Sequence, residues 1–478
     1  MPISPLTAAL DMLGRDSRLG TNASETVSYL MDLLYYGEFD ILEQVSSGEA
    51  YERVNLIGTK GHEGHDEPLW LIGLFNSSAD PAPSRWASLD GKAFSPRVDT
   101  AAGVIRGLGA NAKLDVVLKI LAASRFRLEE LVRPVYIAAV SGEEAVGSGV
   151  RSLLASGPTP RGVALVGAPT NLELWADHPG CVTLRLELTR RLRHRRMPPS
   201  RGFFEVEVDG RSAHAQLGRG LGDDAIAAGL AVLSRLRAHG ELRLLELEAG
   251  ESANRVAGRC RMRIATSFDE MPDLGPGVVS RPIEDGAALP FPVGNLFKAW
   301  LRARDAGVAA IRERLGIPRN ARGARPAVPV WTGHLKTHRN AVEGHLTFWT
   351  GPGVGVQEVC EGFAAAVQNA LVGVEEVEVD IVVLQDRPPL AASEDDGPLR
   401  DLAKSAMRAA GLVPTVAAGT LTSDAGLLRA AGVPSLVFGP GRGAGDLYRD
   451  DESIPLAHID AAYRFYVALI ERWCTRRG

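Results

Sequence analysis

The chain has 478 residues, enough for two or three domains, and its composition is that of an ordinary globular protein. Apolar residues make up 45%, charged residues make up 23%, and the formal net charge is -5. These values exclude the basic field that nucleic-acid binding needs, and no apolar run is long enough to span a bilayer. The first residues lack the charged start and apolar core of a secretory signal. We therefore expect a cytoplasmic protein with neither a nucleic-acid nor a membrane partner.

Short apolar runs alternate with helical segments in the first part of the chain. Strands are predicted at 69–75, 135–140 and 163–166, and helices at 114–123 and 149–156. This alternation favours an α/β domain with a largely parallel sheet sandwiched by helices. Three polar segments follow these strands directly: 76–80, 141–144 and 167–170. We expect them to converge at the carboxyl edge of the sheet, where such domains bind ligands.

A different pattern begins near Cys181. The basic stretch 185–201 is expected to be a solvated loop, with an anion-binding patch as the alternative. The elements predicted after it follow the β-α-β-β-α-β order of a ferredoxin-like module. An extra loop insertion is expected over about 268–342, and the α/β pattern returns from Arg387. We therefore expect an α/β domain formed by 1–180 and 387–478, a domain inserted over 181–386, and hinges near Gly180 and Arg387.

The cysteines and two of the histidines do not point to a metal centre. The four cysteines are far apart and contain no CxxC pair: Cys181, Cys260, Cys360 and Cys474. Single thiols in or near the core are therefore expected. His62, His65 and Asp66 lie in a polar segment that reads as a solvated turn.

Several motifs of this chain resemble those of a zinc amidohydrolase family, and they follow one another in the same order as in that family. The family includes aminoacylase, acetylornithine deacetylase, succinyl-diaminopimelate desuccinylase, glutamate carboxypeptidase and bacterial dipeptidases. The clearest is VDGRSAHA at 208–215, and NRV at 254–256 is similar to the family's Asn-x-Val element. Near the end, TSD at 422–424 and FGPG at 438–441 also match. The resemblance covers nearly the whole chain. It implies a zinc-exopeptidase-like α/β domain and an inserted ferredoxin-like lid that closes over the cleft and carries a homodimer surface.

The resemblance also implies chemistry that depends on two zinc ions bridged by a carboxylate and a water, with a glutamate as general base. Of the five ligand positions, only Glu144 is retained. The others carry residues with no strong donor for zinc: Ser78, Ala112, Ala168 and Tyr448. A catalytic zinc usually has three protein ligands and a water. We therefore expect no cofactor, and zinc only if substitute ligands such as His62, His65 or Asp66 hold it.

Other positions of the family site are retained. The resemblance implies that Glu143 is the general base, that Asp80 orients a neighbouring group, and that His214 contacts the carbonyl oxygen of the substrate. The expected substrate contacts are Ser78, Glu144, Asn254, Gly439, Gly441 and Tyr448. A structural reading stays open for His214, as a cap at the end of an element, and for the two glycines, as a turn.

Three functions remain open on the sequence. The first is a metal-independent enzyme that acts on an amide or acyl-amine substrate, such as an amino-acid or peptide-like small molecule, by hydrolysis, acyl transfer or amide formation. Because a zinc-free site must replace the carbonyl polarisation that zinc supplies, this reading favours activated acyl donors. The alanine- and arginine-rich composition suggests a bacterial source and a role in specialised metabolism. The second function is a pseudopeptidase that binds or scaffolds, and the third is a metallopeptidase with substitute zinc ligands.

Overall fold

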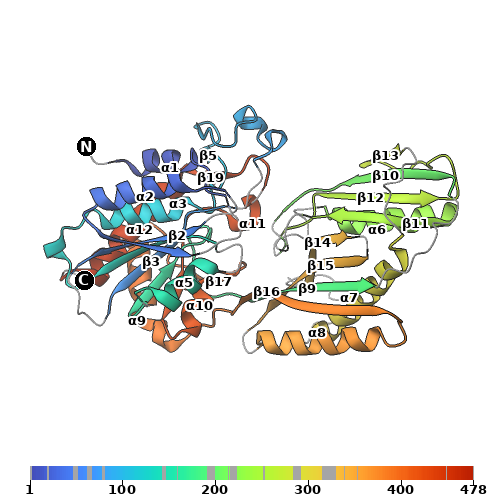
Figure 1. Cartoon of the computed structure of the whole chain (residues 1–478). Helices are drawn as coiled ribbons and strands as arrows, with labels where there is room; N and C mark the ends of the chain where they lie inside the picture. The colour runs from blue at the N-terminus through green and yellow to red at the C-terminus, as the bar shows by residue number, and fades with distance from the viewer. Residues whose placement is uncertain are drawn as a thin grey trace. The chain divides into compact units, whose positions relative to one another are not determined.

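The computed structural model divides the chain into two compact units, Met1–Gly180 with Arg387–Gly478, and Cys181–Asp386. Figure 1 shows the elements of each unit. The described residues are 3–18, 21–46, 52–61, 67–77, 81–142, 147–158, 160–190, 200–213, 215, 223–250, 253, 255–283, 292–314, 330–338, 340–351, 354–447 and 449–476.

The first unit is built on an eight-stranded sheet in the order β1-β2-β6-β3-β7-β18-β8-β17. Its strands are β1 (Asp40–Ser46), β2 (Arg53–Lys60), β3 (Leu69–Leu74), β6 (Val135–Val140), β7 (Val163–Val166), β8 (Leu174–Asp177), β17 (Val416–Ala418) and β18 (Ser435–Val437). The central strands β6, β3, β7 and β18 are parallel, whereas β1 and β2 pair antiparallel at one edge. Every residue of β3 and β7 is buried, as the continuous apolar runs predict.

Helices cover both faces of this sheet (Figure 1). On one face pack α1 (Pro5–Leu13), α2 (Ser24–Tyr36), α3 (Leu114–Ala123), α9 (Gly397–Ala409) and α12 (Leu456–Cys474). The other face contacts α5 (Ser148–Ser156) and α10 (Ala425–Ala430). In α12, Ile459, Ala462, Tyr466 and Leu469 are buried at helical spacing, which turns one stripe of the helix into the core. A small sheet of β4 (Arg97–Asp99), β5 (Val104–Arg106) and β19 (Ser453–Pro455) lies beside them.

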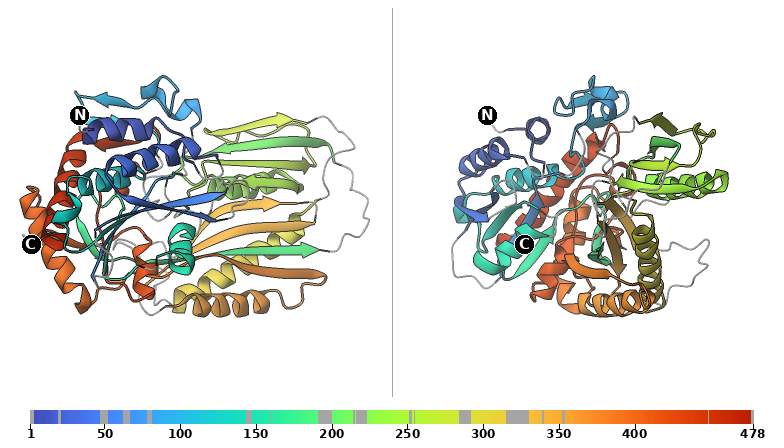
Figure 2. Two further views of the ribbon diagram at one scale, coloured as in Figure 1. Left: turned by 60° about the vertical axis from the view of Figure 1, so that its left-hand side comes forward. Right: turned by 45° about the vertical axis from the view of Figure 1, so that its right-hand side comes forward.

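The second unit contains a second eight-stranded sheet, in the order β13-β10-β12-β11-β14-β15-β9-β16. Its strands are β9 (Gly180–Arg190), β10 (Gly202–Asp209), β11 (Leu242–Ala249), β12 (Arg259–Thr266), β13 (Val278–Pro282), β14 (Val330–Thr337), β15 (Ala341–Thr350) and β16 (Val377–Arg387). Three helices lie on one face of it: α6 (Ala225–His239), α7 (Gly294–Arg314) and α8 (Val356–Ala370) (Figure 2).

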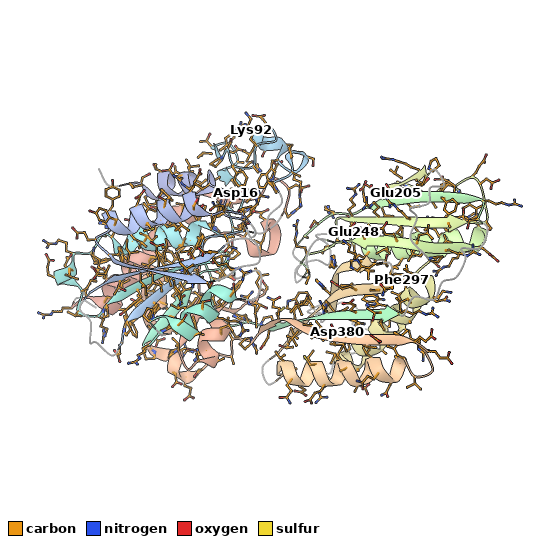
Figure 3. The ribbon with its side chains drawn as sticks, in the orientation of Figure 1. Asp16, Lys92, Glu205, Glu248, Phe297 and Asp380 are labelled. Atoms are coloured by element: carbon orange, nitrogen blue, oxygen red, sulfur yellow. The ribbon has the colours of Figure 1, made fainter. Side chains whose placement is uncertain are left out.

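The two faces of the second sheet differ in chemistry. Phe297 of α7 lies in the apolar core beneath the helices, where it is 1% exposed. The opposite face carries a ladder of ion pairs, in which Glu205 contacts Arg263 and Asp380 contacts Arg185. Figure 3 labels Phe297, Glu205 and Asp380 on these elements. Alternation of apolar and charged residues along each strand produces this division.

The inserted unit is larger than the predicted ferredoxin-like module. The start of the basic stretch 185–201 is strand rather than loop, because Val182, Leu184, Leu186 and Leu188 of β9 alternate into the core. The expected loop insertion over 268–342 contains two strands that were not predicted, β13 and β14, whereas α7 agrees with a helix predicted at about 295–314. The charged residues at exposed positions concealed the period-two pattern of these strands.

The four thiols bear out a simpler expectation. All four cysteines are free, and Cys181, Cys260 and Cys474 are buried. Burial raises the pKa of the Cys260 thiol to about 12, so it stays protonated and packs as an apolar group. Within the described ranges, no helix is both long and apolar enough to cross a bilayer.

Candidate active site

Four loops meet at the carboxyl edge of the parallel strands in the first unit. They follow β3, β6, β7 and β18. The loop after β3 contacts the loop after β6 where the Gly142 N–H donates to Asn76 Oδ1 at 3.1 Å. The loop after β7 is held to β3 by a hydrogen bond from the Gly167 N–H to the Ile72 carbonyl at 2.8 Å. The sheet thus brings together the polar segments that the sequence places after these strands.

Most of the predicted site residues fall outside the described residues. These are Ser78, Asp80, Glu143, Glu144, His214, Asn254 and Tyr448, together with the substitute-ligand candidates His62, His65 and Asp66. Their roles stay predictions. Gly439 and Gly441 are described, as are Ala112 and Ala168, which stand at two of the metal-ligand positions of the family resemblance.

Both described ligand positions lie in the loops of this edge. Ala112 sits in the turn before α3, where its N–H donates to the Gly109 carbonyl at 3.0 Å. Ala168 follows β7 directly, and the Thr170 N–H donates to its carbonyl at 2.8 Å. Each residue is only partly buried. A methyl group has no donor atom for zinc, so neither position can hold a metal ion.

Gly439 and Gly441 let the loop after β18 pack closely against its neighbours. A Cβ atom at Gly439 would lie 2.5 Å from the Ala168 carbonyl oxygen, and one at Gly441 would lie 2.6 Å from Asn111 Oδ1. Gly441 also has φ +100, a conformation that favours glycine. Both glycines therefore have a packing role at the edge of the site, beside the substrate contact predicted for them.

A buried carboxylate anchors the loop that carries Ala112. Glu452 is 1% exposed and accepts hydrogen bonds from the Gly109 N–H at 3.2 Å and the Asn111 N–H at 2.8 Å. Asn111 Oδ1 in turn accepts from the Arg442 N–H at 2.8 Å. Burial raises the pKa of Glu452 to about 7, and these hydrogen bonds oppose the rise. These hydrogen bonds hold the loop before α3 against Arg442 and Glu452, which lie on either side of position 448 in the chain.

Lys113, the residue after Ala112, is buried, and its pKa is far below that of a free lysine. Its ammonium group donates to the Arg15 carbonyl at 2.7 Å. Burial lowers the pKa of Lys113 to about 7, while Asp16 and Glu452 act to raise it. The side chain is 0% exposed, so it supports the loop and does not reach solvent.

A buried polar cluster holds the start of α3 beneath the loop after β7. Asp115 and Lys119 form an ion pair of 2.5 Å, and the Tyr466 hydroxyl donates to Asp115. A Cβ atom at Gly167 would lie 1.9 Å from Asp115 Oδ2, so glycine is required there. Burial raises the pKa of Asp115 in spite of Lys119. This cluster positions the backbone on which Ala168 sits.

The two chain segments that join the units are tied together inside the first unit. His178 and Leu390 exchange backbone hydrogen bonds of 3.0 and 3.1 Å. The side chain of His178 lies 2.9 Å from Ser423 Oγ, and Arg387 forms an ion pair of 3.1 Å with Asp424. Burial lowers the pKa of His178 to about 4, so the ring is neutral. Ser423 and Asp424 belong to the TSD motif, which therefore has a structural role at this joint.

The donor set of the described residues does not fit a two-zinc centre. Glu452 is engaged with backbone N–H groups, and His458 Nδ1 accepts from the Gly441 N–H at 3.1 Å. Within the described part of the first unit, no three His, Cys, Asp or Glu side chains gather closely enough to hold a metal ion. Together with the alanines at 112 and 168, this donor set gives zinc chemistry no support among the residues described.

Sequence reasoning did not single out Asn111, Glu452 or His458 as members of the site. Two of them lie close to ligand positions of the resemblance, Asn111 directly before Ala112 and Glu452 four residues after Tyr448. Their contact joins positions that are 341 residues apart, and a local sequence pattern cannot predict a contact over such a separation. His458 carries no motif signal, because it lies on the first turn of an ordinary amphipathic helix.

Solved structures with this fold cover almost the whole chain. A dipeptidase, Dug1p from Saccharomyces cerevisiae, has a TM-score of 0.61 at 11% identity, with 98% of this chain and 95% of that chain covered. The M20 family metallo-carboxypeptidase Sso-CP2 from Sulfolobus solfataricus has a TM-score of 0.59 at 13% identity, covering 98% and 99%. Human carnosine dipeptidase 1 has a TM-score of 0.57 at 12% identity, covering 98% and 96%. The structural similarity over almost the full length of each chain establishes the fold.

No curated protein sequence is significantly similar to this chain. The sequence pattern of peptidase family M20/M25/M40, in contrast, matches residues 77–472. The match spans most of the chain and includes both units. It confirms the resemblance drawn from the motifs and, with the structural neighbours, the predicted α/β fold with an inserted domain. The chain belongs to peptidase family M20/M25/M40.

Proposed function

We propose that this chain carries out acyl chemistry on an amide or acyl-amine substrate without a two-zinc centre. The observation that carries the proposal is the presence of Ala112 and Ala168 at two ligand positions, in loops that are otherwise firmly anchored at the edge of the sheet. Two metal-ligand side chains are replaced, while the hydrogen bonds and close contacts that hold their loops are present. This combination favours a substrate cleft that works without the two zinc ions. The substrate in this proposal is a small amino-acid or peptide-like molecule.

Glu143 is the proposed proton-transfer group, and His214 is the proposed stabiliser of the oxyanion. Both assignments rest on the family motifs at these positions, and Asp80 is assigned a supporting role in the same way. Without a metal to polarise the carbonyl, hydrolysis of an unactivated amide is disfavoured. Acyl transfer from an ester or thioester to an amine, with release of the alcohol or thiol, suits this site better, and so does transfer of the same acyl group to water. Specialised metabolism in a bacterium is the proposed setting, and a homodimer formed through the second unit is the proposed assembly.

The test is turnover of a panel of N-acyl amino acids, esters and thioesters, with amines as acceptors, in the presence and absence of a chelator. We expect chelator-resistant turnover that falls by roughly 100-fold or more in Glu143→Gln, the usual size of a general acid–base contribution. The control is Glu129→Gln, because the Glu129 side chain is 66% exposed on the surface of the first unit. Turnover that chelators abolish would contradict the proposal and favour substitute zinc ligands. Tight binding of substrate analogues without turnover would favour a pseudopeptidase.

A further inference from the structure

Two histidines and a glutamate meet on the charged face of the second sheet. His334 lies on β14, and Glu343 and His345 lie on β15. His334 and His345 are directly opposite in the antiparallel register, with ring centroids 4.7 Å apart. Glu343 is two residues from His345 and therefore on the same face, with its Oε1 3.0 Å from His345 Nε2.

We propose that His334, Glu343 and His345 form a binding site for a divalent transition-metal ion, with Zn²⁺ as the best fit. One ligand atom from each side chain lies within 4.8 Å of the others. Two imidazoles and one carboxylate are a common three-ligand set for zinc, with water in the fourth position. Tetrahedral zinc places its donors roughly 3.3 Å apart, so side-chain rotations that shorten the distances between donor atoms by up to about 1.5 Å would complete the site.

A backbone hydrogen bond orients one of the ligands. His334 Nδ1 lies 3.2 Å from the Gly250 carbonyl oxygen, which can only accept, so this nitrogen carries the proton. The lone pair is then on Nε2, free for a metal ion. Metal-binding histidines characteristically donate their second ring nitrogen to a carbonyl or carboxylate in this way. The contact is independent of the cluster and favours a ligating orientation of the ring.

The site is reachable from solvent, and the cations near it already have partners. The side chains of Glu343 and His345 are 21% and 22% exposed. Lys336, which lies opposite Glu343 in the register, forms an ion pair of 3.1 Å with Glu248. Arg185 forms one of 2.6 Å with Asp380. The ion pairs of these two cations are therefore with Asp380 and Glu248, although the charge of Arg185 also interacts with Glu343.

This site is separate in the chain from the family's ligand positions, all of which lie in the first unit. The inference goes beyond the proposed function and does not depend on it. Because three ligands leave a coordination position open, the bound ion can take a water or an anionic ligand as its fourth partner.

The test is Zn²⁺ titration of the purified full-length chain against a chromophoric chelator. We expect the wild type to bind one Zn²⁺ per chain, and His345→Asn and His334→Asn to weaken that binding by about 100-fold or more. The matched control is His338→Asn, since His338 lies on the same hairpin but is exposed and outside the cluster. Unchanged circular dichroism and thermal unfolding without metal will show that the variants fold.

Two results would overturn the inference. One is a wild type that binds no Zn²⁺ more tightly than His345→Asn does. The other is a bound ion that Glu144→Gln removes and His345→Asn retains, which would place the metal at the family's ligand position instead.

Discussion

At the scale of single residues, the edge of the site depends on buried ionisable groups that support loops. Glu452 holds the loop of Ala112, and Asp115 with Lys119 and Tyr466 holds the loop of Ala168. An unpaired buried charge is costly, so each of these groups is satisfied by hydrogen bonds or an ion pair. The motifs of the sequence indicated the loops. They did not indicate these supports, because their partners come from distant parts of the chain.

Glu452 should make stability depend on pH in a specific direction. Its pKa is raised from 4.5 to about 7, so the folded state holds the proton more tightly than the unfolded state does. The stability contribution is therefore fully present below about pH 4.5 and is lost as the pH rises through about 7. In Glu452→Gln the titration is absent, and the amide NH₂ faces backbone donors. We expect the variant to be less stable than the wild type by about 1–3 kcal/mol at pH 5, with a smaller difference at pH 8.

Urea unfolding of both proteins at several pH values measures this difference. A gap between wild type and variant that widens as the pH rises would mean that Glu452 is ionised in the folded state, with its backbone donors outweighing burial. The loop would then be held by a carboxylate anion rather than by a protonated acid.

At the scale of elements, strands made of apolar residues alone were predictable from the sequence. Strands in which charged and apolar residues alternate were not. The strands 69–75, 135–140 and 163–166 were predicted close to β3, β6 and β7, because burial on both faces leaves a continuous apolar run. In β9, by contrast, the half-buried Arg185 and Glu187 alternate with the apolar residues, and the basic residues that follow made the segment look like a loop. For the same reason, polar and charged residues among the apolar ones, β13 and β14 were not predicted as strands.

The joint at His178 offers a test at this scale. Its Nδ1 lies 3.0 Å from the Pro179 carbonyl, so Nδ1 donates and Nε2 accepts from the Ser423 hydroxyl. Ser423→Ala removes the donor and leaves a buried ring nitrogen unpaired. We expect a loss of about 1–3 kcal/mol in the free energy of unfolding. The amides of His178 and Leu390, which pair with each other, should also exchange faster.

The control for this variant is Ser84→Ala, a serine on an exposed 3-10 turn of the same unit. Urea unfolding gives the free energies, and hydrogen exchange followed by mass spectrometry gives the local opening. Equal stability and equal exchange in Ser423→Ala and Ser84→Ala would show that the hydrogen bond does not hold the two joining segments.

At the scale of the whole molecule, the chain keeps the M20 architecture, and alanine stands at two positions where the family resemblance implies metal ligands, Ala112 and Ala168. The fold class could be predicted because motifs recur in order along the chain and fix its elements. The chemistry could be predicted only as far as residue types allow: alanine excludes a ligand, whereas a retained glutamate does not establish a role. Metal content separates these possibilities, provided that the proposed site on the second sheet is removed first.

The most direct measurement is therefore elemental analysis of the His334→Asn/His345→Asn double variant. The protein should be purified without chelator or metal-binding tag, exposed to Zn²⁺ and dialysed, beside wild type treated in the same way. The account predicts no retained zinc in the folded double variant and at most one ion per wild-type chain. About two zinc ions per chain of the double variant would contradict the central claim and restore a co-catalytic metal centre built from substitute ligands.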